Sequence, residues 1–175
     1  CIRYRIKRVK TQKKTKKSLF LPLSSAKEVL PDCSKLVSSK NNNDFYDDYA
    51  HHPTEINAIA DALDTFYPNQ TKMGVFQPHL FSRTRDFVKG FKKALARFDE
   101  VLILDVYPAR ELPIEGITST LLVDANHDAT YLIDKHKLLE MIVKSTATIV
   151  AIMGAGDISF EVPKVIQTLK NQQDA

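Results

Sequence analysis

The stretch EVLILDVY, residues 100 to 107, is an apolar run that ends in a polar, proline-containing loop. An uninterrupted apolar run of this length is typical of a strand that is covered on both faces, as in a parallel sheet. A second run of this kind, TIVAIM, occupies residues 148 to 153. Because strands buried on both faces need helices on both sides, these two runs predict an α/β domain.

The rest of the chain alternates short strand candidates with helical patterns. Weaker strands are predicted at DFYDD (44–48), KMGVFQ (72–77) and around TYLI (130–133). A first helix is predicted to begin at Pro53 and Thr54, and a short helix follows the loop after residue 107. Four longer helices each show an apolar stripe at helical spacing. The stripes comprise Ile56, Ile59, Ala60, Leu63 and Phe66 in the first; Phe87, Phe91, Leu95 and Phe98 in the second; Leu138, Leu139 and Ile142 in the third; and Val162, Val165, Ile166 and Leu169 in the fourth. This alternation predicts a mostly parallel sheet flanked by helices over residues 44–171.

The two ends of the chain do not share this pattern. Residues 1–17 carry nine Lys or Arg and no acid, so the remaining 16 basic and 21 acidic residues give the rest of the chain a net charge of −5. Residues 1–43 are therefore interpreted as an atypical basic and polar segment, disordered or aberrant, and residues 172–175 as a tail. Since no aromatic residues interleave with the basic run as an RNA-binding signature, nucleic acid is not expected as a partner.

The cysteine content and the lengths of the apolar stretches indicate the cellular compartment in which the protein works. Cys1 and Cys33 are too few for a disulfide framework and lack metal-ligand spacing, which favours a reducing compartment. No apolar stretch in this sequence is long enough to span a bilayer, and no signal peptide is expected ahead of the domain. We expect a cytoplasmic protein with no membrane partner.

Polar clusters follow the predicted strands. DDYAHHP (47–53) follows the first, QPHLFSRTR (77–85) the second, DVYPARE (105–111) ends the third, and GAGD (154–157) follows the last. Because ligands of open parallel sheets bind in the crevice beyond the carboxyl ends of the strands, the four clusters predict one binding site.

The residue types at this edge suggest anion binding. Adjacent side chains on a strand point to opposite faces, so only one of Asp47 and Asp48 is expected to enter the crevice. His51 and His52 are neighbours without the spacing of a metal site, so hydrogen bonding to phosphate or ribose oxygens is favoured over metal binding. A metal-dependent hydrolase that uses Asp48 and the histidines remains an open alternative.

The other two clusters offer cationic and backbone groups. His79, Arg83 and Arg85 surround a predicted helix start, where guanidinium groups and backbone N–H groups can hold a carboxylate or a phosphate. The turn from Gly154 to Gly156, with Asp157, allows close approach of a ligand to the backbone. No G-x-x-x-x-G-K-[ST] phosphate loop occurs in the sequence, so the crevice is expected to be half of an active site.

Four motifs in this order, DDYAHHPTE (47–55), GVFQPHLFSRTRDF (74–87), DVYPARELPIEG (105–116) and MGAGDI (153–158), resemble the C-terminal domain of the Mur ligase family. The resemblance is to the branch that joins L-alanine to UDP-N-acetylmuramate in peptidoglycan synthesis, and it covers residues 44 to about 171. It implies a Rossmann-like α/β domain of a three-domain enzyme. The first domain would hold the UDP-sugar, and the central domain would carry the phosphate loop and most of the Mg²⁺ and catalytic groups.

The resemblance also implies roles for single residues. Asp48, with His51 and His52, would face the ATP, whereas Tyr49, His79 and Arg83 would hold the incoming L-alanine. Arg85, Gly154, Gly156 and Asp157 would line the same crevice. No catalytic residue and no metal ligand is expected within this domain alone.

The resemblance is incomplete at one position of the proposed alanine site. Leu80 stands where many family members have arginine, so a carboxylate contact is left open for His79 or Arg85. The partners implied are L-alanine, UDP-N-acetylmuramate, ATP and the other two domains of the enzyme, and this chain alone is expected to be inactive. The alternative is a non-catalytic ligand-binding or scaffold domain that has lost its catalytic part.

Overall fold

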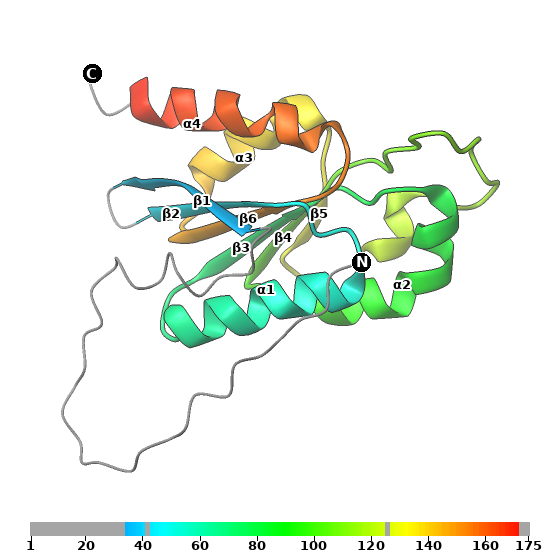
Figure 1. Cartoon of the computed structure of the whole chain (residues 1–175), viewed down its shortest axis with the longest axis horizontal. Coiled ribbons are helices and arrows are strands. Elements are labelled where there is room, and N and C mark those ends of the chain that lie inside the picture. Colours follow the sequence, from blue (N-terminus) through cyan, green and yellow to red (C-terminus); the bar gives the residue numbers. More distant parts are fainter. Residues whose placement is uncertain (1–33, 41–42, 125–126, 172–175) are drawn as a thin grey trace, which may run out of the picture.

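The computed structural model describes residues 34–40, 43–124 and 127–171, and predictions for the other residues lie outside this range. Within it, one sheet has six strands in the order β1-β2-β6-β3-β4-β5 (Figure 1). The strands are β1 (Ser34–Lys40), β2 (Asn43–Asp48), β3 (Lys72–Phe76), β4 (Glu100–Ile103), β5 (Thr130–Leu132) and β6 (Ile149–Met153). Strands β2 to β6 pair in parallel and β1 pairs antiparallel to β2, so the predicted α/β class and mostly parallel sheet are confirmed.

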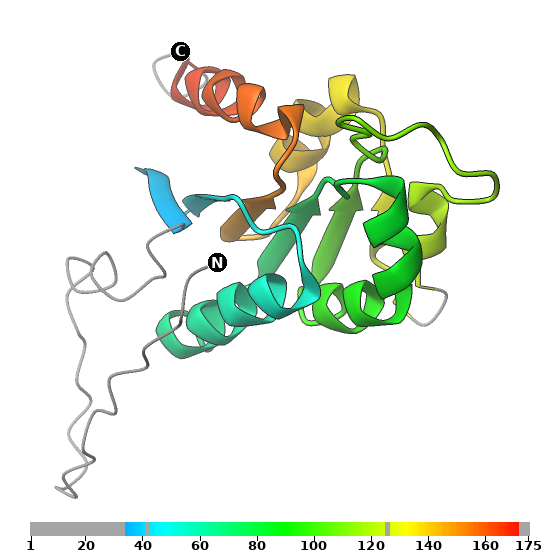
Figure 2. The same ribbon diagram turned by 45° about the vertical axis from the view of Figure 1, so that its right-hand side comes forward.

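Helices cover both faces of the sheet. Figure 1 shows α1 (Pro53–Phe66) and α2 (Phe81–Leu95) on one face and α3 (Leu138–Lys144) and α4 (Val162–Asn171) on the other, and Figure 2 shows the same layers after rotation. Short 3₁₀ turns occupy Ser119–Leu122, Lys135–Lys137 and Asp157–Phe160. The last two turns lead into α3 and α4 at the carboxyl edge of the sheet.

Alternation along the strands divides the core into two layers. In β6, Ile149, Ala151 and Met153 pack on the α1 and α2 side, whereas Val150 and Ile152 pack on the α3 and α4 side. Successive side chains of a strand point to opposite faces, and here both faces are buried. This is why the run reads as continuously apolar in the sequence.

The structure differs from the prediction at two strands. Strand β4 ends at Ile103 rather than residue 107, and Asp105 beyond it is exposed. Strand β1 lies in a stretch without sustained hydrophobic periodicity, where no element was expected. An edge strand contributes backbone hydrogen bonds whatever its side chains, which explains why periodicity does not reveal it.

The prediction that Phe87 belongs to the buried stripe of α2 is wrong. Its side chain is 40% exposed, while Phe91, Leu95 and Phe98 are buried as expected. Phe87 has non-helical dihedral angles, φ −118° and ψ 17°, which break the regular helical period at this point. Its ring instead contacts that of His52, with 4.6 Å between the ring centroids.

A buried polar group on the α1 side is fully paired. The Tyr67 hydroxyl donates to Asp44 Oδ2 at 2.5 Å and lies 2.6 Å from the Tyr46 hydroxyl. Burial raises the pKa of both tyrosines, so both hydroxyls stay protonated as donors.

Tyr67→Phe is expected to lower the free energy of unfolding by about 1–3 kcal/mol, because it leaves the buried Asp44 carboxylate without its donor. Urea denaturation measures this, with Tyr131→Phe as the control, since Tyr131 is 42% exposed. Equal stability of the Tyr67→Phe variant and the parent chain would contradict the assignment.

Candidate functional site

Three loops bring aromatic and basic side chains together at the carboxyl edge of the sheet. The ring of His51 lies 5.4 Å from that of Tyr49 and 5.9 Å from that of His79, measured between centroids. The His79 ring stacks on Tyr107 at 5.8 Å. Arg83 Nη1 lies 3.4 Å from His79 Nδ1. We call these five residues, Tyr49, His51, His79, Arg83 and Tyr107, the His79 cluster.

The turn after β2 is held by Asp48. Its Oδ1 accepts a hydrogen bond from the Ala50 N–H at 2.7 Å, and its carbonyl oxygen accepts one from the Gly154 N–H at 3.1 Å. Asp48 is 3% exposed. The side chain therefore shapes the turn that presents Tyr49 and His51, and it ties this turn to the glycine turn after β6.

His51 and His52 point to different neighbours. The Nδ1 atom of His51 lies 2.9 Å from the Tyr49 carbonyl oxygen, which only accepts, so this nitrogen carries the proton. His52 is the N-cap of α1: its Nδ1 accepts the Thr54 N–H at 3.3 Å, and Glu55 Oε2 accepts the His52 N–H at 3.0 Å in a capping box. Only His51 of the pair belongs to the His79 cluster.

His79 is kept neutral by its surroundings. A guanidinium only donates, so the contact with Arg83 makes His79 Nδ1 the acceptor and leaves the proton on Nε2. Burial lowers the pKa of His79, and the charges of Arg83 and His51 lower it further, against an opposing effect of Glu111. At neutral pH the cluster thus combines a neutral imidazole donor with the positive charge of Arg83, which suits an incoming carboxylate.

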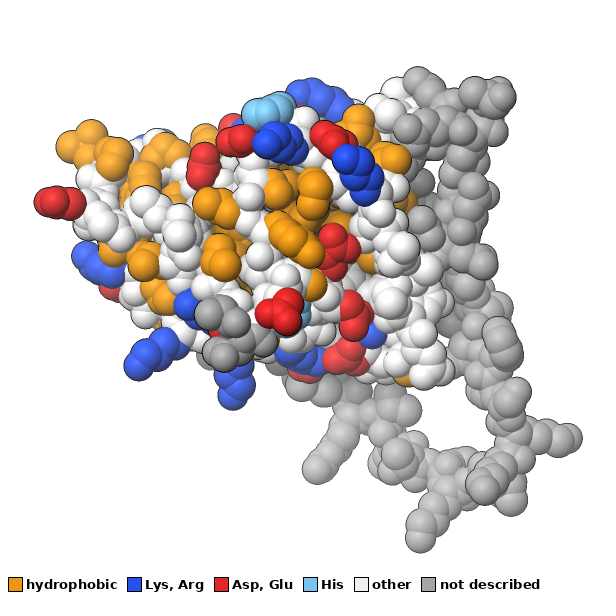
Figure 3. All heavy atoms as spheres, turned by 180° about the vertical axis from the view of Figure 1, so that it is seen from behind, with side chains coloured by type: hydrophobic (Ala, Val, Ile, Leu, Met, Phe, Trp, Pro, Cys, Tyr) orange, Lys and Arg blue, Asp and Glu red, His pale blue; other side chains and the backbone are white. Residues whose placement is uncertain are grey.

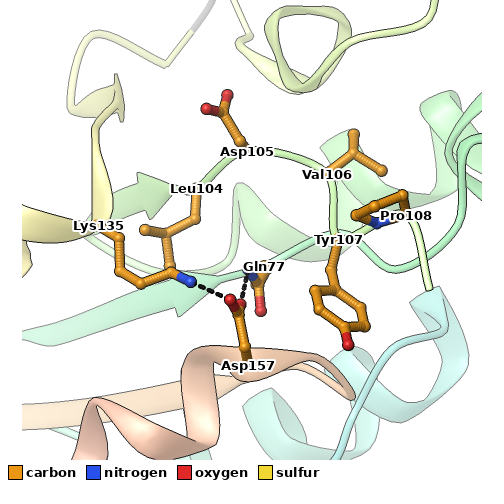
Figure 4. A pocket seen from close by; sticks show the side chains of 8 residues that line it. All are labelled: Gln77, Leu104, Asp105, Val106, Tyr107, Pro108, Lys135 and Asp157. Carbon is orange, nitrogen blue, oxygen red and sulfur yellow. Dashed lines mark hydrogen bonds and ion pairs between the residues drawn. The ribbon is translucent and has the colours of Figure 1, made fainter. Parts of the chain in front are cut away.

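A pocket of about 220 Å³ shares one residue, Tyr107, with the His79 cluster, and Figure 4 shows the side chains that line it. Its lining comprises Gln77, Leu104, Asp105, Val106, Tyr107, Pro108, Lys135 and Asp157. Lys135 forms an ion pair with Asp157, and Gln77 Nε2 donates to Asp157 Oδ1 at 2.7 Å. Burial raises the pKa of Asp157, but the hydrogen bonds from Lys135 and Gln77 outweigh it and lower the pKa, so the carboxylate is charged.

The glycine turn fits closely under this pocket. A Cβ atom on Gly156 would lie 2.6 Å from both Gln77 Oε1 and Tyr107 Cγ. Gly154 has φ +156° and would bring a Cβ atom to 3.1 Å from the Gln77 carbonyl oxygen. The turn therefore allows Gln77 and Tyr107 to approach the backbone after β6.

Arg85 is separate from the cluster. Its Nε lies 2.7 Å from Asp86 Oδ1, and both side chains are about half exposed, at 52% and 51%. Leu80, between His79 and the first residue of α2, has φ 71°, a backbone conformation that leucine rarely adopts. The structure thus brings Tyr49, His51, His79 and Arg83 together and places Asp157 and the glycines alongside, but it leaves Arg85 and His52 outside.

Three residues of this edge were missed by sequence reasoning. Gln77 and Tyr107 lie in two of the predicted polar clusters, 77–85 and 105–111, but neither was singled out as a site residue. Lys135 lies in the charged stretch DKHK (134–137), which resembles an ordinary solvated loop. Only the contact with Asp157, 22 positions away, gives Lys135 its place in the pocket.

The described residues provide no group of three or more His, Cys, Asp or Glu side chains that could hold a metal ion. In the same part of the chain, no helix has the length and apolar character needed to cross a membrane. The space-filling view in Figure 3 shows the face opposite to that of Figure 1, where hydrophobic side chains are interspersed with charged ones.

Comparisons with known proteins agree on one family. The model of the family described as "Mur ligase, glutamate ligase domain" matches residues 34–156. The chain is 52% identical over 131 residues to UDP-N-acetylmuramate–L-alanine ligase from Flavobacterium psychrophilum, covering 74% of this chain and 28% of that protein. It is 54% identical over 127 residues to the ligase of the same name from Christiangramia forsetii, covering 72% and 28%. The chain thus spans about 28% of the length of these relatives.

Solved structures support the fold. The UDP-N-acetylmuramate–alanine ligase MurC from Thermotoga maritima matches with a TM-score of 0.60 at 23% identity, over 78% of this chain and 29% of that chain. A murein peptide ligase from Psychrobacter arcticus matches with a TM-score of 0.62 at 15% identity, over 78% and 29%.

Proposed function

Because the chain belongs to the Mur ligase family, we propose that it is the C-terminal domain of an ATP-dependent ligase that joins L-alanine to UDP-N-acetylmuramate in peptidoglycan synthesis. The observation that carries the choice of substrate is the identity of 52% and 54% to ligases of that name. The His79 cluster is consistent with it, because it offers a charged guanidinium beside a neutral imidazole donor. No observation specifically favours the non-catalytic scaffold or the metal-dependent hydrolase.

In this proposal Arg83 binds the carboxylate of L-alanine. A guanidinium matches a carboxylate with two parallel donors, and the N–H at His79 Nε2 offers a further donor to the same group. Tyr49, which is 63% exposed and packs edge-on against His51, borders the place where the amino acid would lie. Many family members have an arginine at the position of Leu80. Arg85 is already paired with Asp86, so it is a weaker candidate than His79 for the carboxylate contact of that missing arginine.

We assign the nucleotide side of the crevice to the end of β2, with Asp48, His51 and His52. Of these, His51 fits a direct contact best, because it lies at the open edge beside His79. Asp48 and His52 already hold the turn and the first turn of α1. Their proposed effect is to place His51 and the positive end of α1 at the nucleotide.

The proposed chemistry is attack of the amino nitrogen of L-alanine on an acyl phosphate formed from the UDP-N-acetylmuramate carboxylate and ATP, which forms the amide and releases phosphate. The contribution of this domain is to bind and orient the amine donor, an effect of proximity rather than of a nucleophile. The described residues do not offer a Mg²⁺ site, so we assign that ion to the central domain of the enzyme. The working location proposed is the cytoplasm.

The first test uses this chain alone. Supplied with ATP, Mg²⁺, L-alanine and UDP-N-acetylmuramate, it should release no phosphate above the blank, because the sequence has no phosphate-gripping loop. Clear turnover would overturn the proposal that the crevice is half of an active site.

The complementary test restores the other half. In a domain-swapped ligase, a chimera of two proteins, residues 34–171 of this chain replace the C-terminal domain of the Flavobacterium psychrophilum ligase, to which this chain is 52% identical over 131 residues. This protein should release phosphate only when L-alanine and UDP-N-acetylmuramate are both present. A folded domain-swapped ligase without this activity, beside an active parent ligase, would contradict the proposed function.

A further inference from the structure

Two loops of the site are joined by a short ladder of hydrogen bonds. The Tyr107 N–H donates to the Pro78 carbonyl oxygen at 2.8 Å, and the Leu80 N–H donates to the Tyr107 carbonyl oxygen at 2.9 Å. Further along, the Ser82 N–H donates to Glu111 Oε2 at 2.9 Å, and the Ser82 hydroxyl bonds the other carboxylate oxygen. The loop that carries Tyr107 is thus fixed to the segment that carries His79.

Backbone strain is concentrated in the same place. Among the described residues, the non-glycine residues with positive φ are Leu80 at 71° and Ala109 at 52°. One lies in each of the two segments joined by the ladder. Such conformations persist only where the surroundings hold them, and they cluster at binding sites and at elements that move. Here the backbone hydrogen bonds of Tyr107 and the hydrogen bonds between Glu111 and Ser82 can hold Leu80 and Ala109 in these conformations.

The first turn of α2 depends on Glu111 for its cap. Leu80 provides no side-chain cap, and the first turn of α2 contains no acid. Glu111, from a loop 29 positions away, supplies the carboxylate that satisfies the Ser82 N–H. A cap from within the helix would stabilise α2 equally well. A cap from another loop additionally fixes the position of that loop.

We propose that Glu111 is a positioning residue, whose carboxylate clamps the loop of residues 105–111 onto α2 and so holds His79 and Arg83 ready for the amino-acid carboxylate. Arg83 lies in the first turn of the clamped helix, and the His79 ring stacks on Tyr107 of the clamped loop. Without the contacts of Glu111, the strained backbone at Leu80 can relax. The first turn of α2, which carries Arg83, and Tyr107, which stacks on His79, are then no longer held together. The proposal rests on the proposed function of the His79 cluster.

Amide hydrogen exchange on the complete 175-residue chain tests the clamp without a ligand. Glu111→Ala should speed exchange at the Leu80 and Tyr107 amides by about tenfold or more, the range that the loss of a charge-assisted hydrogen bond supports. The buried amides of Val75 and Val101 should keep their rates. The matched control is Glu115→Ala, since Glu115 is an exposed glutamate four residues further along the chain. Faster exchange confined to the Ser82 amide would show an ordinary helix cap and overturn the proposal.

Glu111→Gln provides a variant that keeps a hydrogen-bonding side chain. Loss of the negative charge should lower the pKa of His79 further, because Glu111 is the group that raises it against Arg83 and His51. NMR titration of the His79 ring measures this, and loss of the local structure would instead move the pKa up toward the value of a free histidine. An unchanged or raised pKa would contradict the direct influence of Glu111 on the cluster.

The functional consequence is measured in the domain-swapped ligase. Glu111→Ala should raise the KM for L-alanine at least about tenfold while Glu111→Gln raises it less, with the KM for ATP unchanged. If Arg83→Ala raises the KM for L-alanine and Glu111→Ala does not, the positioning role of Glu111 is refuted while the proposed alanine site stands. If neither variant changes it, the proposed alanine site itself fails.

Discussion

Replacing Arg83 by alanine in the domain-swapped ligase should raise the KM for L-alanine by about 10- to 100-fold. A hydrogen bond to a charged group contributes about 1.5–3 kcal/mol, and each 1.4 kcal/mol is a factor of about ten in affinity. The contact forms when the amino acid binds, before the reaction, so the effect falls on the KM. The KM for ATP should stay within about twofold, and steady-state phosphate release measures both constants.

Arg85→Ala is the matched control for this prediction. Arg85 lies two residues further along α2, and its guanidinium is paired with Asp86 at the surface. Its removal should leave the KM for L-alanine nearly unchanged. Equal effects of Arg83→Ala on the two substrates, or an effect of Arg85→Ala as large as that of Arg83→Ala, would refute the assignment of the carboxylate to Arg83.

Gly156→Ala should have the largest effect on stability at the site. The new methyl group would lie 2.6 Å from Gln77 Oε1 and from Tyr107 Cγ, and 2.8 Å from Tyr107 Cβ, so Gln77 or Tyr107 must move. Overpacking of this kind costs about 1–3 kcal/mol, and each kcal/mol lowers the Tm by about 2–4 °C in a domain of this size. Because Tyr107 supports the His79 ring, the KM for L-alanine should rise as well.

Gly116→Ala separates strain from crowding. Gly116 has φ +76°, but no atom lies within 4 Å of the position that a Cβ would take there, so alanine costs backbone energy without displacing a neighbour. It should lower the Tm and leave the KM for L-alanine unchanged. Thermal unfolding and alanine kinetics on both variants test the pair, and a Gly156→Ala protein with the parent Tm would refute the close packing of the turn.

The fold was largely predictable because its central strands are buried on both faces. Residues 101–104 and 149–153 read as apolar runs, and α1 shows its stripe because Ile56, Ile59 and Leu63 repeat at helical spacing. Strand β1 was not predictable, since an edge strand pairs through its backbone. The burial of Phe87 was predicted wrongly. Its spacing fits the apolar stripe of α2, but a local break in the helix turns its side chain to the surface.

Part of the site could also be predicted. His79, Arg83 and Tyr49 follow strand ends, and neighbouring parallel strands bring their carboxyl ends together, so the residues meet. Lys135 and Glu111 were not identified, because each acts through a partner far away in the sequence. Lys135 pairs with Asp157, and Glu111 caps α2 through Ser82, 29 positions earlier, and neither contact leaves a local pattern.

The most direct test of the account compares L-alanine with L-alaninamide, which lacks the carboxylate charge, as substrates of the domain-swapped ligase. The parent protein should prefer L-alanine in kcat/KM by about 10- to 100-fold, the range that a charge-assisted contact supports. Arg83→Ala should abolish most of this preference, because the two substrates then meet the same site. If the preference survives intact in the Arg83→Ala protein, the carboxylate is bound elsewhere and the central claim is contradicted.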